Sequence, residues 1–106
     1  MDEKKLLYLD TETTDIQAKD IVQLAFITDN PDIWLNLYFN PTQEISYSAM
    51  AIHSITPEEV ADCPKFNDAV IPDEGKDVRF SGYNLVEYLT FLSKNYIWVA
   101  HNADFD

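Results

Sequence analysis

Residues 6–14 read LLYLDTETT, an apolar run that passes directly into acidic and hydroxyl-bearing side chains. Four consecutive apolar residues predict a strand covered on both faces, and the threonines that follow favour continued extended geometry. Asp10 and Glu12 therefore stand at the end of a strand. Because side chains alternate along a strand, their spacing predicts that both carboxylates lie on the same face.

Further strands are expected on either side of a central helical region. Residues 21–28 and 34–39 each read as a strand, and the segment 29–32 between them, DNPD, has the residue types of a turn. We expect the first three strands to form an antiparallel meander. Pro41 marks the end of this pattern, because proline supplies no ladder donor. Residues 96–100 are the last apolar strand.

The helical region begins with a short segment over residues 46–52 and a clearer start at Thr56. Thr56 can cap a helix, Pro57 suits its first position, and Glu59 stands where a capping box places a carboxylate. Pro64 is expected to end this helix.

A later helix is indicated by apolar residues at helical spacing, namely Leu85, Tyr88, Leu89 and Leu92. The polar segment 72–82 before it, punctuated by proline and glycine, is expected to be a loop or insertion. Trp34 and Trp98 are expected in the core.

This order of elements predicts an α/β domain with a mixed sheet, in which the last strand returns parallel to the first. The carboxyl ends of these two strands would then meet at one sheet edge, where segment 101–106, HNADFD, supplies another acid. Three carboxylates would converge where open α/β sheets usually bind ligands. No element is left to cover the second face of the sheet, so we expect a domain that is cut short.

The length, charge and residue counts of the chain exclude some classes of function. With 106 residues, 19 acidic and 7 basic side chains and a net charge of −12, the chain suits one domain or part of one. A basic nucleic-acid clamp is excluded as the main binding device, and with Arg79 as the single arginine, phosphate handling would need metal ions. Oxygen donors without a cysteine cluster select Mg²⁺ or Mn²⁺, and two such ions about 3.5–4 Å apart can promote phosphodiester cleavage.

Cellular location is indicated only by what the sequence lacks. Cys63 is the single cysteine, and the amino end carries no secretory or membrane-spanning segment. These features predict a cytoplasmic protein with no membrane partner.

Four segments together resemble the DnaQ-like 3′–5′ exonucleases of the DEDD group: YLDTETT at 8–14, IVQLAFI at 21–27, AIHSITPEEV at 51–60 and VAHNADFD at 99–106. They occur in the family's order, and the combination is specific although each segment alone is weak. The resemblance implies a ribonuclease H-like fold, of which the chain would span the amino-terminal two thirds. It also implies hydrolysis of terminal phosphodiesters at a single-stranded or frayed 3′ end of DNA or RNA.

The resemblance assigns catalytic, metal-binding roles to three residues. Asp10 and Glu12 match the first-motif metal ligands, and Asp106 matches the second-motif aspartate. His101 and Asp106 also have the H-x-x-x-x-D spacing of the third motif, but Asn102 and Phe105 fit the second. The general-base histidine and the final aspartate would then be absent, so the 106-residue chain is expected to be catalytically incomplete.

The resemblance also suggests residues for substrate binding. In the family, the stretch matching residues 51–56 lines the groove for the terminal nucleotide, which makes Ile52 and His53 candidates for contact with it. The residues after the first-motif glutamate approach the sugar and phosphate of that nucleotide in the family, which makes Thr13 a third candidate. For His53, packing beneath the loop is an equally weighted alternative. Asp15 stands where the family often has glycine, so the turn there is expected to differ.

Two other functions compete with the exonuclease. One is a non-catalytic, exonuclease-like module that binds metal, nucleic-acid ends or a protein partner, and a stop codon directly after Asp106 would favour it. The other is an acidic decoy of nucleic acid, which predicts carboxylates spread over one face instead of converging. A polymerase or another replication or repair protein is a candidate partner, and the sequence does not distinguish DNA from RNA as substrate.

Overall fold

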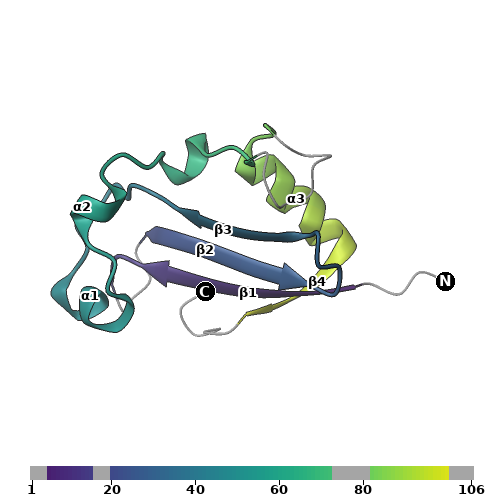
Figure 1. Cartoon of the computed structure of the whole chain (residues 1–106), viewed down its shortest axis with the longest axis horizontal. Helices are drawn as coiled ribbons and strands as arrows, with labels where there is room; N and C mark the ends of the chain where they lie inside the picture. Colours follow the sequence, from purple (N-terminus) through teal and green to yellow (C-terminus); the bar gives the residue numbers. More distant parts are fainter. Residues whose placement is uncertain (1–4, 16–19, 73–81, 101–106) are drawn as a thin grey trace.

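The computed structural model describes residues 5–15, 20–72 and 82–100, which form one mixed four-stranded sheet with helices beside it (Figure 1). The strands are β1 (Lys5–Thr13), β2 (Ile21–Thr28), β3 (Trp34–Tyr38) and β4 (Tyr96–Ala100). Their order across the sheet is β3-β2-β1-β4. The pairs β1–β2 and β2–β3 are antiparallel, and β4 is parallel to β1. This arrangement confirms the predicted α/β, ribonuclease H-like sheet.

The turn between β2 and β3 follows from the residue types of its sequence. The side-chain oxygen of Asn30 accepts a hydrogen bond from the Asp32 amide at 2.9 Å, and the backbone carbonyl of Asn30 accepts one from the Ile33 amide at 3.0 Å. An asparagine that bonds the backbone two residues ahead is a common way to start a turn. The predicted hairpin is therefore confirmed.

The helices are α1 (Tyr47–His53), α2 (Pro57–Val60), a 3₁₀ turn (Phe66–Asp68) and α3 (Leu85–Asn95). In Figure 1, α1 and α2 lie beyond the left ends of the strands, near the arrowhead of β1. The three longer segments were expected from caps and periodicity, whereas the 3₁₀ turn was not. None of the helices within the described ranges is both long and apolar enough to cross a bilayer.

The predicted helix start at Thr56 is confirmed, with a modified capping box. The Thr56 hydroxyl oxygen accepts a hydrogen bond from the Glu59 amide at 3.4 Å, and the hydroxyl donates to the Glu59 carboxylate at 3.1 Å. Pro57 is the first helical residue, as its fixed φ favours. The helix ends at Val60, four residues before the proline expected to close it.

The main hydrophobic core lies between one face of the sheet and α3. It is built from buried side chains of β1, β2, β3 and α3, including Leu7, Leu24, Phe26, Leu35, Leu85, Tyr88 and Leu92. Trp98 packs against this cluster, as predicted. A second buried cluster, Val22, Ile45, Ala49, Ile55 and Val60, lies where α1 and α2 meet the sheet.

The opposite face of the sheet, called the open face below, is not covered by any described helix. Tyr8, Ile27 and Val99 are register partners there and remain exposed. The prediction that β1 is covered on both faces is therefore wrong for the described chain. Trp34 pairs with Ile27 on the same face, so its placement in the core was also wrong.

Candidate metal and nucleic-acid site

The two predicted carboxylates emerge on the open face near the carboxyl end of β1. Asp10 is paired with Ala25 and Glu12 with Gln23, before the register shift that separates Glu12 from Thr13. Because residues two apart in a regular ladder share a face, the predicted alignment of Asp10 and Glu12 is confirmed. Thr11 between them points to the core side and is 8% exposed, which anchors the segment that carries both acids.

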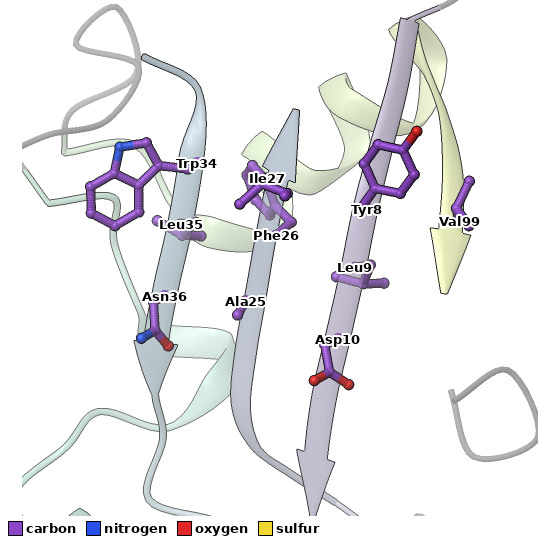
Figure 2. A pocket seen from close by; sticks show the side chains of 10 residues that line it. All are labelled: Tyr8, Leu9, Asp10, Ala25, Phe26, Ile27, Trp34, Leu35, Asn36 and Val99. Carbon is purple, nitrogen blue, oxygen red and sulfur yellow. The ribbon is translucent and has the colours of Figure 1, made fainter. Parts of the chain in front are cut away.

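Asp10 borders a hollow of about 580 Å³ on the open face. Figure 2 shows its carboxylate at one end of this hollow, with Tyr8 and Val99 near the other end and Trp34 and Asn36 across it. The floor is largely apolar, so the acid stands at the edge of an apolar surface. This hollow was not predicted from the sequence, although the alternation of Leu35 and Leu37 with the polar Asn36 in β3 indicated a strand with one exposed face.

A polar rim lies beside the carboxylates. Gln23 is opposite Glu12 in β2, and its side-chain amide donates a hydrogen bond to the Asn36 side-chain oxygen at 2.8 Å. Gln23 is the polar interruption of an otherwise apolar strand, and its place on the open face explains why it is tolerated.

The turn after β1 is held by hydrogen bonds to its own backbone and to neighbouring loops. The Thr13 hydroxyl donates to the Asp15 carbonyl at 2.7 Å, the Thr14 amide donates to the Asp20 carbonyl at 2.8 Å, and the Ser46 amide donates to the Thr14 carbonyl at 2.7 Å. Among the described residues, Ser54 is the one non-glycine with a positive φ, so Asp15 avoids the conformation that glycine would favour.

The predicted substrate-binding residues gather beside this turn. His53, the last residue of α1, places Nε2 3.0 Å from the Thr13 carbonyl oxygen, and its Nδ1 is 3.0 Å from the Ile55 amide nitrogen. Ile52 is next to it on α1 and is 71% exposed. The structure thus brings Thr13 and His53 into contact and leaves the Ile52 side chain at the surface.

The donor set suits a hard cation, but the described residues supply only part of it. Asp10 and Glu12 are oxygen donors of the kind that Mg²⁺ and Mn²⁺ prefer. No group of three or more His, Cys, Asp or Glu side chains within residues 5–15, 20–72 and 82–100 is placed to hold a metal. The third predicted ligand, Asp106, lies outside the described residues. The described part of β4 ends at Ala100, which is paired with Leu9, the residue before Asp10.

Comparisons with known proteins give a consistent set of relatives. No family model matches the sequence. The chain is 33% identical over 101 residues to "Uncharacterized exonuclease CP81" of Escherichia phage 186, a match that covers 94% of this chain and 44% of that protein. It is 30% identical over 121 residues to "DNA polymerase III subunit epsilon" of Buchnera aphidicola, with 100% and 43% of the two chains covered.

A solved structure agrees with these relatives. "Exonuclease X in complex with 5′ overhanging duplex DNA" superposes with a TM-score of 0.56 and 29% identity, over 95% of this chain and 51% of that one. The chain therefore spans less than half of each of the two curated relatives and about half of this solved chain.

Proposed function

Because the relatives in sequence and in fold support a DnaQ-like 3′–5′ exonuclease domain, we propose that this chain is the amino-terminal part of such a domain. Its proposed activity is the metal-dependent removal of nucleotides from a 3′ end of DNA or RNA. The observation that carries the proposal is the placement of Asp10 and Glu12 on one face of β1, near the end of a strand flanked by parallel β4.

The proposed roles of the acids follow from their chemistry. Asp10, Glu12 and Asp106 would hold Mg²⁺ or Mn²⁺, two ions in the complete site, which supply activation of water and stabilisation of the leaving oxygen. The chain has a net charge of −12, so a phosphate approaching without cations would be repelled. The buried Thr11 and the paired neighbours of β1 keep both acids on one side of the sheet, which is the positioning a metal site needs.

The proposed substrate is a single-stranded or frayed 3′ end. Thr13, Ile52 and His53 would form the wall of its groove, since His53 contacts Thr13 in the turn that follows Glu12 and Ile52 precedes His53 on α1. Exonuclease X was solved in complex with 5′ overhanging duplex DNA, which supports a nucleic-acid end as the ligand of this chain. The epsilon subunit of the related polymerase makes a polymerase a candidate partner, and we propose a cytoplasmic location.

The test reads binding instead of turnover, because the third motif of the family was not found in the 106 residues. Mn²⁺ affinity is measured by electron paramagnetic resonance for the chain and for Asp10→Asn and Glu12→Gln. Loss of a residue that only supports a metal ligand weakens metal binding by roughly 10–100-fold. Because Asp10→Asn and Glu12→Gln each remove a proposed ligand itself, we expect Mn²⁺ affinity to fall by at least as much. Asp29→Asn, an exposed acid in the β2–β3 turn, is the matched control and should leave the affinity unchanged.

Nucleic-acid binding is then measured on the same variants. Fluorescence anisotropy of a 5′-labelled oligothymidine and of the matching oligouridine should rise with protein only when Mn²⁺ is present. Equal Mn²⁺ affinity in the chain, Asp10→Asn and Glu12→Gln would overturn the proposed function, provided that circular dichroism shows all three folded.

A further inference from the structure

We propose that His53 is a positioning residue, which holds the turn behind Glu12 in place through the backbone carbonyl of Thr13. The role rests on the proposed function in one respect, that Glu12 and Thr13 face the metal and the terminal nucleotide. The contacts that define it are properties of the fold alone.

The hydrogen bonds of the ring select one of its tautomers. The Ile55 amide can only donate, so Nδ1, 3.0 Å away, must present a lone pair. A neutral imidazole with a bare Nδ1 carries its proton on Nε2. The Thr13 carbonyl can only accept, and it lies 3.0 Å from Nε2. Two backbone partners of opposite character therefore fix His53 as the neutral Nε2–H form.

The orientation of the ring comes from a buried anchor. Ile55 is 5% exposed and belongs to the cluster beneath α1 and α2, so its amide is held in place by the packing of its side chain. Between the two residues, Ser54 adopts a left-handed conformation with φ 64°, which turns the chain so that the Ile55 amide meets the ring. The ring thus bridges the buried cluster and the end of β1.

The carbonyl that receives this bridge is at the irregular end of β1. The register of β1 with β2 shifts between Glu12 and Thr13, so regular ladder geometry is interrupted there. α1 holds this point from both of its ends, because the Ser46 amide that precedes it donates to the Thr14 carbonyl at 2.7 Å while His53 reaches Thr13. The two ends of one short helix therefore clamp consecutive carbonyls directly after Glu12.

His53 would therefore act on the nucleotide indirectly, through the position of Thr13. Both ring nitrogens are occupied by backbone groups of the chain, so the ring acts on the groove by fixing the Thr13 backbone. Loss of the Nε2–H donor would leave the Thr13 carbonyl without this restraint and loosen the position of Thr13 relative to Glu12.

The first test is the tautomer itself. The chain labelled with ¹⁵N-histidine contains two histidines, His53 and His101, and the variant His101→Gln assigns their signals. Long-range ¹H–¹⁵N spectra at neutral pH should show His53 protonated at Nε2 and bare at Nδ1. A ring protonated at Nδ1, or averaging between both forms, would overturn the proposal without any measurement of activity.

The second test separates the two hydrogen bonds by substitution. The amide nitrogen of glutamine reaches about as far as Nε2, so His53→Gln can restore the donor to Thr13. Asparagine reaches only as far as Nδ1, so His53→Asn can accept from Ile55 but cannot reach Thr13. We expect oligonucleotide affinity in Mn²⁺ to fall about fivefold in His53→Asn, the effect of one lost hydrogen bond, and to stay within about twofold in His53→Gln.

The outcomes are distinguishable. Wild-type oligonucleotide affinity in His53→Asn, or equal losses of affinity and stability in both variants, would overturn the positioning role and leave the metal-site result intact. Equal Mn²⁺ affinity in the chain, Asp10→Asn and Glu12→Gln would overturn the proposed function, whereas the tautomer measurement stands or falls separately.

Discussion

At the scale of single residues, Ser54 carries a conformational cost that a smaller residue would avoid. It closes α1 with φ 64°, and its amide donates to the Met50 carbonyl at 2.8 Å. Glycine is the residue that most often occupies this position after a helix, because it has no Cβ to oppose the left-handed backbone. The Ser54 side chain is exposed, so its removal sacrifices little packing.

We therefore expect Ser54→Gly to raise the free energy of unfolding by about 0.5–1 kcal/mol, the left-handed penalty less the added flexibility of the unfolded chain. Urea denaturation measures the change. Gly82→Ala is the matched opposite, because Gly82 has φ 82° and an added Cβ would meet nothing within 4 Å. It should lose about 1 kcal/mol from the backbone alone. If Ser54→Gly did not raise the free energy of unfolding, or Gly82→Ala did not lower it, the backbone conformation would not be the origin of the two effects.

At the scale of elements, α3 depends on a single capping side chain. The Asn84 side-chain oxygen accepts from the Val86 amide at 2.9 Å and the Glu87 amide at 3.3 Å. Its amide group also donates to the Asn67 carbonyl at 3.0 Å, which ties the helix start to the 3₁₀ turn. Asn84→Ala removes both functions and should cost about 1–2 kcal/mol of unfolding free energy.

Asn84→Asp separates the capping hydrogen bonds to Val86 and Glu87 from the hydrogen bond to the Asn67 carbonyl. Aspartate keeps the accepting oxygen and adds a favourable charge at the helix start, but it cannot donate to Asn67. We expect its unfolding free energy to lie between those of the wild type and Asn84→Ala in urea titrations. If Asn84→Asp lost as much unfolding free energy as Asn84→Ala, the hydrogen bond to Asn67, and not the cap, would be what supports α3.

Elements with a strong apolar pattern were predicted closely from sequence. The bounds of β2 and β4 match the predicted ranges, because their runs end abruptly in polar or turn-forming residues. β1 extends beyond its apolar run to Lys5 and Thr13, since pairing with strands on both sides prolongs the ladder. The 3₁₀ turn at Phe66–Asp68 is too short to show periodicity, so no pattern could reveal it.

The candidate site was predictable where local geometry decides and unpredictable where distant segments meet. The common face of Asp10 and Glu12 follows from the two-residue period of a strand. The contact between His53 and Thr13 joins residues 40 apart, and it depends on how α1 packs on the sheet. Asp106 stays a prediction, because it lies outside the described residues.

At the scale of the whole molecule, the two faces of the sheet differ in what they touch. One face packs on α3 and excludes water, whereas the open face presents Tyr8, Ile27 and Val99 together. Adjacent residues of β2 report this difference, because Phe26 is 2% exposed and Ile27 is 62% exposed. Phe26 and Ile27 should therefore contribute very differently to the free energy of unfolding, although both are large apolar residues.

Phe26→Ala is expected to cost about 3–5 kcal/mol of unfolding free energy, since it opens a cavity in the core beside Tyr88. Ile27→Thr keeps a β-branched side chain on an exposed strand position and should change stability by less than about 0.5 kcal/mol. The same variant should lower the fluorescence of a bound apolar dye, because it interrupts the exposed apolar surface between Tyr8 and Trp34. A large loss of stability in Ile27→Thr would mean that the second face is buried in solution, and the one-sided core inferred from the described residues would then be wrong.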